Sequence, residues 1–459
     1  MNFMHGIRLW LCIALLWGAS FAYSAEKLEK GSCVEGSVIS SIEFEGLEQT
    51  RPRVVERELL NRVGEPYSAQ KFETEKLRLQ DLDLFTEIEV SCENKHSAAP
   101  DSNSQLTAHN SKLTYRFKEI FRWIPAPAGK KTDRDGLMLG LALANLNVLG
   151  EDIRAEVQYR TTVDPFFEKN EYAFYASSPY FFGFALGWNF EFLVMDNYDD
   201  IRGFRDKSLL LDLDLDYEFL PHFSLLWTLA YRDLKKAAAL PEFGAGFAFD
   251  FRDSKLDTRR GVYYEYMLTH VGFGDDHQSD CNVASAESAE ESCGGMGGEN
   301  YWELLTDARA YYSLWRFVTG ATALVRFRPG DVKFYDYYYH GGANTFRGHE
   351  ADSNSLGVHE ALLTLEERFV LMDRHAASIA GVNFFYGVQL VAGLDGSLLW
   401  DKGNPSWKDY EGAVYGGLHL VIPALDRIRF EVGYSPDRGE PVFYFGLFDK
   451  VTSSRWRSR

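Results

Sequence analysis

The sequence lacks the features that mark a helical membrane protein or a nucleic-acid-binding protein. Beyond the N-terminus, its 459 residues contain no apolar run of about 18 residues, and the mean hydropathy is -0.26. Basic residues are scarce, with 48 Lys and Arg against 67 Asp and Glu, and the net charge is -19. No basic stripe is present that could follow a phosphate backbone. The sequence therefore predicts neither membrane-spanning helices nor a nucleic-acid partner.

Catalytic signatures are also missing. The sequence contains no G-x-S-x-G elbow, Walker loop, H-E-x-x-H motif or dinucleotide fingerprint. His340, His349 and His359 recur at intervals of nine and ten residues, which is not the spacing of metal ligands on one strand. Carboxylate pairs such as Asp212 and Asp214 are more typical of a hydrated face than of an acid and base couple. We therefore expect a protein that is not an enzyme and that needs no cofactor or metal.

Proline is infrequent, with 14 residues against 46% hydrophobic and 15% aromatic residues, which excludes a disordered or collagen-like chain. The N-terminus resembles a signal peptide, because Arg8 precedes an apolar run from Leu9 to Trp17 and small residues continue to Ala25. We predict a signal peptide at residues 1–25 and export from the cytoplasm. An uncleaved anchor helix is the alternative, although this apolar run is shorter than the ~20 residues that spanning needs.

Only five cysteines occur, and Cys12 lies in the predicted signal peptide. The other four, Cys33, Cys92, Cys281 and Cys293, form an even set in an exported chain, where disulfides are permitted. Three pairings are open. We favour Cys33 with Cys92 and Cys281 with Cys293, because each pair would then lie within one domain and the second pair within one loop. Their spacing does not match a zinc site.

Residues 33–120 contain alternating helical and strand patterns. A strand is expected at residues 38–44, followed by a helix over 51–61 that Thr50 caps and whose first turn holds Pro52. Ser68 is the expected cap of a second helix, and two strands follow at 85–93 and 112–120. This order predicts one small α+β domain.

From residue 121 onward the sequence alternates with a period of two. Leu209, Leu211, Leu213, Leu215 and Tyr217, for example, alternate with Leu210, Asp212, Asp214, Asp216 and Glu218, which are all charged after Leu210. Strands of about 10 residues with charges on one face and aromatics on the other suit a bilayer better than a soluble sandwich, whose strands are shorter. We predict a transmembrane antiparallel barrel over residues 121–448, with a tail at 449–459. About 16 strands are expected, at residues 121–129, 135–146, 151–163, 170–178, 182–194, 206–219, 222–233, 242–253, 260–272, 299–312, 315–328, 360–371, 383–398, 412–422, 427–436 and 441–448.

One loop between these strands contains the sequence Gly341, Gly342, Ala343, Asn344, Thr345, Phe346, Arg347, Gly348. Glycines permit positive φ and close approach of the backbone, and an arginine between them can grip a carboxylate with its planar fork. By itself the pattern is weak and is more typical of an ordinary surface loop. Counting strands places the base of this loop at the outward-facing rim of the barrel. Its tip would therefore have to fold back down to enter the lumen.

This loop resembles the GG-x-x-x-[VI]-RG-[FY] motif of the BamA/TamA outer-membrane assembly superfamily, in which the Arg enters the barrel lumen and meets an inward carboxylate. His349 stands where that family usually has an aromatic residue. Two further stretches match in order, at 364–369 for "x-x-E-L-R-F" and at 393–397 for "F-x-D-x-G". The N-terminal domain resembles a POTRA module, with the stretch 82–88 in place of its "L-x-x-x-G-x-F-x-x-V" corner. The resemblance implies a 16-stranded barrel in the bacterial outer membrane with a periplasmic POTRA-like domain.

An arginine that enters a narrow lumen loses hydration and needs a charged partner, for which a bidentate carboxylate is the strongest choice. Period-two counting places Glu366 and Asp395 on the lumen face, and we expect Asp395 to be the first partner of Arg347 and Glu366 the second. Gly393 stands where the family often has Phe. Glu367 falls on the lipid face, which is tolerable near a rim. Arg347 would either fix the loop inside the barrel or take part directly in transport.

The first predicted strand contains Pro125 and Pro127, each of which removes a ladder donor and is typical of a sheet edge. We therefore expect a weakly closed junction between the first and last strands, the junction at which the superfamily is thought to open. The alternative is that residues 121–128 form a linker and the barrel begins later. The stretch 442–448 resembles the terminal strand of outer-membrane proteins.

The resemblance implies a protein that inserts or translocates polypeptides. Its expected partners are unfolded or partly folded polypeptide clients, outer-membrane lipid and accessory periplasmic proteins. The POTRA-like domain would capture peptide at a sheet edge, or act only as a spacer. A passive channel for solutes is the alternative function, and an outer-membrane hydrolase is a third for which no nucleophile is recognised. One POTRA-like domain favours an accessory role over that of a core assembly subunit.

Overall fold

A computed structural model of the chain describes residues 33–96, 109–132, 136–163, 169–181, 183–199, 201–202, 204–234, 238–254, 257–273, 300–330, 332–342, 344–352, 355–379, 382–401, 403–422 and 427–447. The predicted signal peptide, the Cys281 and Cys293 pair and the C-terminal tail lie outside these ranges. Within the described part of the chain, no helix is long and apolar enough to cross a membrane.

The N-terminal domain follows the predicted order of elements. It contains β1 (Val38–Glu45), α2 (Pro52–Glu56), α3 (Ala69–Asp81), β2 (Phe85–His96) and β3 (His109–Glu119). The three strands form a sheet in the order β1-β3-β2, so β1 and β2 are its edges. Val54, Val55, Leu79, Leu113 and Tyr115 are all fully buried.

The first helix is much shorter than predicted, and its cap is not the predicted one. It ends at Glu56 instead of Asn61, and its N-cap is Arg51, without a side-chain hydrogen bond, instead of Thr50. Asn61 is fully buried, and its side chain accepts a hydrogen bond from Ser68 N (2.9 Å) and donates one to Ser68 O (3.2 Å). These bonds hold residue 61 in a turn and so compete with continuation of the helix.

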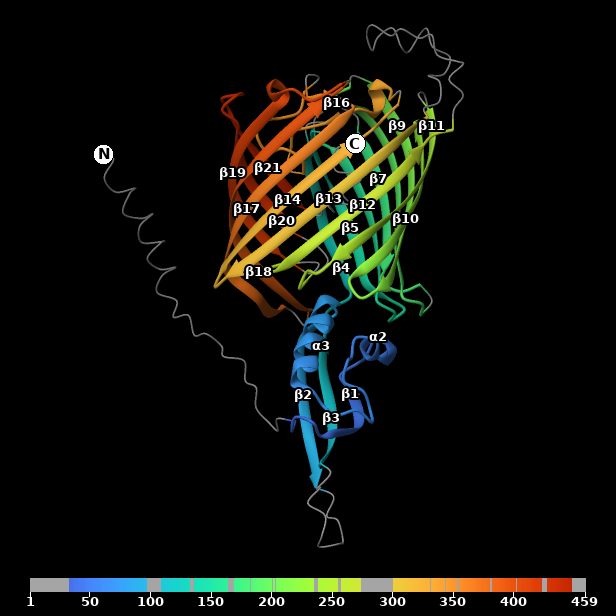
Figure 1. The fold of residues 1–459 in the computed structure, drawn as a ribbon, viewed down its shortest axis with the longest axis vertical. Helices are drawn as coiled ribbons and strands as arrows, with labels where there is room; N and C mark the ends of the chain where they lie inside the picture. The colour runs from blue at the N-terminus through green and yellow to red at the C-terminus, as the bar shows by residue number, and fades with distance from the viewer. Residues whose placement is uncertain are drawn as a thin grey trace, which may run out of the picture. The chain divides into compact units, whose positions relative to one another are not determined.

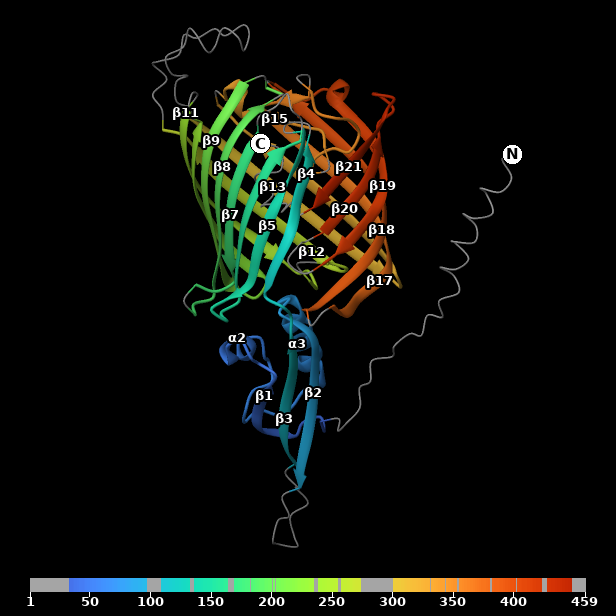
Figure 2. The same ribbon diagram turned by 180° about the vertical axis from the view of Figure 1, so that it is seen from behind.

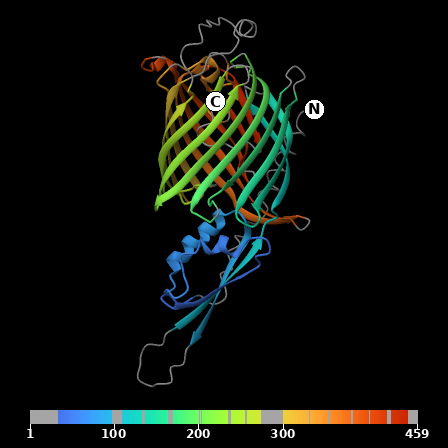
Figure 3. The same cartoon turned by 90° about the vertical axis from the view of Figure 1, so that its right-hand side faces the viewer.

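Sixteen antiparallel strands form the barrel, and each corresponds to a predicted strand (Figure 1). They are β4 (Trp123–Thr132), β5 (Gly136–Val148), β6 (Ile153–Thr162), β7 (Asn170–Ser178), β8 (Leu186–Asp199), β9 (Phe204–Leu220), β10 (Phe223–Leu234), β11 (Ala238–Asp250), β12 (Gly261–Val271), β13 (Tyr301–Leu314), β14 (Phe317–Phe327), β17 (His359–Ile379), β18 (Val382–Trp400), β19 (Tyr410–Val421), β20 (Arg427–Tyr434) and β21 (Pro441–Leu447). Figure 3 shows the strands around residue 200 inclined and side by side in the wall.

The outside of this wall is apolar and the inside is charged. In β5 the alternate residues Leu137, Leu139, Leu141 and Leu143 are all exposed, whereas Met138, Ala142 and Ala144 are buried. On many strands the buried positions are polar, among them Asp212, Glu242, Asp307, Arg326, Glu360, Gln389 and Glu431. A soluble protein has the reverse arrangement, so the pattern fits a barrel surrounded by lipid around a polar lumen.

The junction between β21 and β4, called the seam below, closes the ring through few contacts. At this junction (Figure 2), the residues that the structure describes pair at two positions, Gly446 with Lys130 and Leu447 with Gly129, whereas β4 pairs with β5 at ten positions. Residues 123–128 therefore belong to a strand and not to a linker.

The prolines of β4 lie with their nitrogens toward the seam. Leu146 N donates to Arg122 O (3.0 Å), and these two residues are directly opposed in the register of β4 and β5. Because hydrogen-bonded and non-bonded pairs alternate in an antiparallel ladder, the polar backbone groups of Pro125 and Pro127 point away from β5. Neither residue has an N–H to offer at the seam.

The hairpin of β17 and β18 is longer than predicted, because β17 continues to Ile379 instead of ending at residue 371. Register shifts between Val370 and Met372 and between Met372 and His375 break the alternation at this point. A bulged strand of this kind loses the period-two pattern in its sequence. The prediction ended the strand where that pattern ended.

The segment between β14 and β17 contains its own short elements. These are the 3-10 helix η1 (Phe334–Asp336) and the strands β15 (Tyr338–Tyr339) and β16 (Leu356–Gly357), which pair with each other. A further 3-10 helix, η2 (Trp407–Asp409), precedes β19. The predicted Gly-Gly and Arg-Gly motif lies between β15 and β16.

Candidate functional site

The loop that carries the motif makes a tight turn at its first glycine. Gly341 has a φ of 135°, and a Cβ atom there would lie 2.4 Å from Ala351 N. Its N–H donates to Thr345 Oγ1 (3.0 Å), and that hydroxyl donates back to Gly341 O (2.6 Å). Both the backbone conformation and the close approach require glycine. The turn directs residues 345–349 into the lumen, and Thr345, Phe346, Arg347 and His349 are all buried.

Phe346 supplies the apolar contact of the loop. It is fully buried and packs in a cluster with Met267, Leu305, Leu324, Leu362 and Ala413, contributed by β12, β13, β14, β17 and β19. A Cβ atom on Gly348 would lie 2.4 Å from the Phe346 ring and 2.9 Å from Ala413 Cβ. Burial of an aromatic ring of this size contributes about 2 kcal/mol or more to holding the loop.

The structure brings Arg347 and Asp395 together. Arg347 Nε donates to Asp395 Oδ2 (2.7 Å), and Nη2 donates to Asp395 Oδ1 (2.8 Å). The backbone N–H of Arg347 also donates to Asp395 Oδ2 (3.1 Å). This fork-to-fork geometry is the strongest form of an arginine–carboxylate pair. Thr364, on the neighbouring strand β17, adds a hydrogen bond to Asp395 Oδ1 (2.9 Å).

Two more carboxylates face the same guanidinium. Glu431 Oε1 accepts from Arg347 Nη1 (3.1 Å), and Glu366 Oε2 lies 3.9 Å from that nitrogen. Glu366, the second partner chosen from the sequence, is therefore an outer neighbour, and Glu431 takes the closer place. The sequence analysis did not choose Glu431 as a partner.

Tyr415 covers the face of the guanidinium. Arg347 Cζ lies 3.3 Å from the ring centroid, and the Tyr415 hydroxyl donates to Glu366 Oε2 (2.9 Å). The ring fits there because residue 393 is glycine, whose Cβ would lie 2.5 Å from the ring. The missing bulk at Gly393 is thus filled by an aromatic residue from the neighbouring strand β19. A cation stacked on an aromatic face is stabilised by the ring quadrupole.

A second glycine fixes the distance between the loop and the wall. A Cβ atom on Gly433 would lie 1.6 Å from Arg347 O, so the loop backbone passes directly against β20. Only glycine allows this approach.

His349 replaces the aromatic residue of the motif and packs as one. Its ring lies edge to face with Phe346 at 5.2 Å, Nε2 lies 2.7 Å from Glu411 Oε2, and Nδ1 lies 2.7 Å from Glu350 O. The Tyr444 hydroxyl donates to His349 O (3.0 Å). His349 is in the loop and not in a spanning strand. Burial opposes its protonation, but the hydrogen bonds to Glu411 and Glu350 outweigh burial and raise its pKa above the ordinary value.

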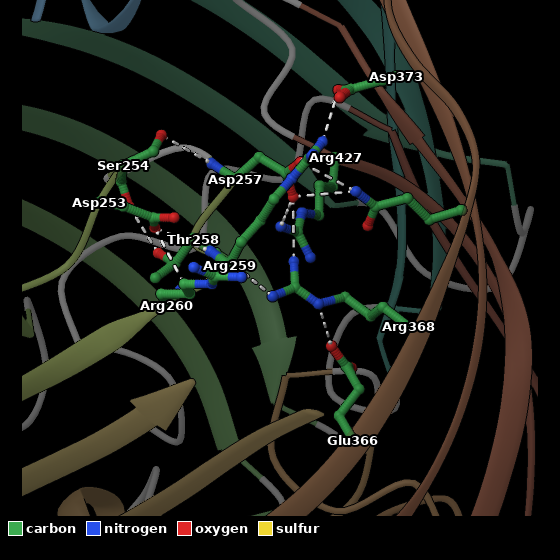
Figure 4. A network of polar contacts seen from close by, with 11 residues as sticks. Asp253, Ser254, Asp257, Thr258, Arg259, Arg260, Glu366, Arg368, Asp373 and Arg427 are labelled. Carbon is green, nitrogen blue, oxygen red and sulfur yellow. Dashed lines mark hydrogen bonds and ion pairs between the residues drawn. The ribbon is translucent and has the colours of Figure 1, made fainter. Parts of the chain in front are cut away.

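A second segment also enters the lumen, and the sequence analysis did not find it. The described residues 251–254 and 257–260, between β11 and β12, are called the β11–β12 turn below. Asp257 accepts hydrogen bonds from Arg368 Nη1 (3.0 Å) and Arg427 Nη2 (2.9 Å), which come from β17 and β20 (Figure 4). Gln389 of β18 donates to both oxygens of Asp257 (2.9 and 3.1 Å). Arg368 and Gln389 share the period-two faces of Glu366 and Asp395, but no signal in the sequence of this turn indicated that it points inward.

Glu366 lies between these two networks. Its Oε2 accepts from Tyr415 and faces Arg347, while Oε1 lies 3.5 Å from Arg368 Nε. Glu367, the next residue, faces outward and accepts a hydrogen bond from Thr319 Oγ1 (2.7 Å), near the end of β14. A half-buried carboxylate opposite the first residues of β14 is consistent with a rim position.

The remaining predicted residues fall in two groups. Cys33 and Cys92 form a disulfide within the N-terminal domain, and Cys281 and Cys293 lie outside the described residues. Within the described part of the chain no group of three or more His, Cys, Asp and Glu residues could hold a metal ion. His340 instead bonds Glu360 Oε2 through Nε2 (2.8 Å).

Residues 145–447 match the family model described as the Omp85 superfamily domain. The chain belongs to the Omp85 superfamily. Residues 37–119 match a second model, described as POTRA, the surface antigen variable number repeat. As in other Omp85 proteins, the barrel lies in the bacterial outer membrane and the POTRA domain in the periplasm. The end of the barrel at which β4 begins is therefore the periplasmic end, and the β11–β12 turn lies there.

Solved structures of the Omp85 type share the fold at low sequence identity. CdiB from Escherichia coli is 15% identical, with a TM-score of 0.59 over 90% of this chain and 76% of that chain. BamA from Haemophilus ducreyi lacking POTRA domains 1–3 is 14% identical, with a TM-score of 0.50 over 89% of this chain and 83% of that chain. A comparison with curated proteins finds no match.

Proposed function

We propose that this Omp85 protein inserts polypeptides into the outer membrane, or moves them across it, by opening at the seam. The observation that carries the proposal is the pairing of β21 with β4, which among the described residues up to 447 occurs at two positions, against ten between β4 and β5. Ladder hydrogen bonds and cross-strand packing hold neighbouring strands together. The seam is therefore the boundary between strands that separates with the smallest loss of these stabilising contacts. An opening there connects the polar lumen with lipid.

The Arg347 loop fixes the shape of the path. It is bound to β18 and β20 through Asp395 and Glu431 and to the apolar cluster through Phe346. These strands lie next to the seam in the order β18-β19-β20-β21-β4. The loop would brace this part of the wall while the seam opens, so that the lumen keeps its form.

The POTRA domain presents two sheet edges, β1 and β2, to which an extended polypeptide could add as a strand. This capture needs no nucleotide. The free energy for insertion would come from folding of the client and burial of its apolar surface in lipid.

A disulfide across the seam tests the proposal. Lys130→Cys with Gly446→Cys joins two opposed residues of β4 and β21, and Ala308→Cys with Ala323→Cys is the matched control within the closed sheet of β13 and β14. Each variant is reconstituted in liposomes and given a urea-unfolded outer-membrane barrel. Client insertion is measured by protection from protease and by heat-modifiable migration on gels.

The oxidised seam variant should lose insertion, and a reductant should restore it. The control variant should insert equally well in both states, which accounts for reduction of Cys33–Cys92. Full insertion by the locked seam variant would overturn the proposal.

A passive solute channel is the second candidate, and the occupied lumen argues against it. Both the Arg347 loop and the β11–β12 turn bind the lumen wall. We expect no steady conductance of the unaltered chain in planar bilayers. Steady conductance together with no client insertion would favour the channel.

A further inference from the structure

The contact between the β11–β12 turn and the lumen wall has the form of a bound carboxylate in a site for carboxylates. Arg368 of β17 and Arg427 of β20 converge on Asp257 (Figure 4), and Gln389 of β18 joins them. Two guanidinium groups and a carboxamide are the donors that best suit a planar, bidentate anion. The site is thus made by the wall, and the turn supplies only the anion.

The wall needs an anion at this place. Arg368 and Gln389 are almost fully buried, and their Nε and Oε1 atoms respectively have no hydrogen-bond partner. Glu366 is the other carboxylate beside Arg368, at 3.5 Å, and it also faces Arg347. Without Asp257, the guanidinium groups of Arg368 and Arg427 would repel each other and lose acceptors in a site with little water. The turn can therefore leave readily only if another anion takes its place.

The rest of the turn meets the wall through exposed side chains. Arg260 donates to Ser313 Oγ (2.8 Å) and Ser313 O (3.4 Å) near the end of β13. Arg259 pairs with Asp373 at 2.5 Å, but the two side chains are 33% and 58% exposed, and such pairs contribute little. Thr258 O accepts a hydrogen bond from Arg368 Nη2, so this contact depends on the same arginine. The buried part of the attachment thus resides in the groups around Asp257.

We propose that Arg368, Gln389 and Arg427 form a carboxylate-binding site in the periplasmic part of the lumen, which Asp257 occupies at rest and which an acidic side chain of a polypeptide in the lumen takes in its place. The β11–β12 turn is then an internal competitor of the client. The choice of a polypeptide as ligand rests on the proposed function, whereas the competition itself does not.

Peptide binding to the full chain in lipid nanodiscs tests this competition. The probe is a fluorescent Gly/Ser peptide that carries several Asp residues, and its counterpart has Asn at each of those positions. Asp257→Asn removes the competitor, and we expect it to tighten binding of the acidic peptide about ten-fold by freeing the site. Arg427→Gln should abolish that gain when it is added to Asp257→Asn. The Asn peptide should bind no variant.

Asp373→Asn is the matched control, because it removes the same charge at the same end of the lumen without touching the site. It should change the affinity less than two-fold, on the order expected for an exposed pair. An equal gain from Asp373→Asn and Asp257→Asn would mean general electrostatic attraction and would overturn the proposal. Heat-modifiable migration shows that each variant is folded.

Trypsin reports the position of the turn, since Arg259 and Arg260 lie within it. The acidic peptide should speed cleavage at these residues in the unaltered chain, and the Asn peptide should not. Binding without faster cleavage would place the peptide elsewhere and would also overturn the proposal. If client insertion succeeds in liposomes while these peptide tests fail, the proposed function stands and the carboxylate site is refuted. If the peptide tests succeed while client insertion fails, the carboxylate site stands and the proposed function is refuted.

Discussion

The two segments that enter the lumen have opposite charge arrangements. In the Arg347 loop the cation lies on the loop and the carboxylates, Asp395, Glu431 and Glu366, lie on the wall. In the β11–β12 turn the anion, Asp257, lies on the turn and the arginines lie on the wall. Arg347 is also stacked on Tyr415, and the loop around it passes close to its neighbours at Gly348 and Gly433. The partners of Asp257 described above are all polar. We infer that the first contact is a permanent anchor and the second a releasable one.

The largest difference between them should appear when each central charge is neutralised. Arg347→Gln leaves three wall carboxylates near one another without their cation, and we expect it to reduce the free energy of unfolding by about 3–5 kcal/mol. Asp257→Asn keeps a hydrogen-bonding side chain and should cost about 1–2 kcal/mol. The midpoint temperature of heat-modifiable migration measures both. Equal losses would remove the distinction between anchor and releasable contact.

A charge exchange sharpens the same comparison. Arg347→Glu combined with Asp395→Arg would be expected to restore a simple ion pair. Here it should restore only part of the stability, because Glu431 and Glu366 remain beside the new Glu. Adding Glu431→Gln should recover more, and independent effects of all three changes would contradict the network.

The next effect concerns the backbone of the anchor. Gly433→Ala would place a Cβ atom 1.6 Å from Arg347 O and should displace the loop, with a loss on the order of 2 kcal/mol or more. Gly416→Ala on β19 is the control, since its Cβ would lie 3.4 Å from Val391 O, an ordinary contact. The same gel assay compares them. If the Gly433→Ala protein is as stable as the control, the loop backbone does not pack closely against β20.

The smallest expected effect is a pH dependence confined to the anchor. The pKa of His349 is raised in the folded chain, so its contribution is fully present below the unfolded value of about 6.5 and is lost as the pH rises through the higher folded value. His349→Phe restores an aromatic residue and should flatten this part of the stability profile above pH 6.5. Melting midpoints across this range, with and without the substitution, provide the measurement. An unchanged slope would assign the dependence to other groups.

The sequence was informative where a period or a motif constrains the chain. The alternation of residues such as Leu209 to Leu215 predicted strands and faces, and all sixteen barrel strands were found near their predicted places. The order of three short motifs led to Arg347 and Asp395. Both kinds of signal depend on spacing along the chain, which the sequence shows directly.

Other features depend on contacts between distant segments and left no such signal. Glu431 lies 84 residues from Arg347, and Arg427 lies 170 residues from Asp257. The early end of α2 follows from hydrogen bonds of Asn61 to Ser68, which a helical pattern does not reveal. Tyr415 could have been suspected, because a glycine on one strand often accommodates a ring from the next strand.

The prolines of β4 leave its seam edge with more hydrogen-bond acceptors than donors. A strand that lay alongside residues 123–127 would find carbonyl oxygens to which it could donate, but at Pro125 and Pro127 no hydrogen to accept in return. At these two positions such a guest would be held by half of the usual ladder bonds. The edge would bind a passing strand without retaining it, as a transit point for many successive strands requires.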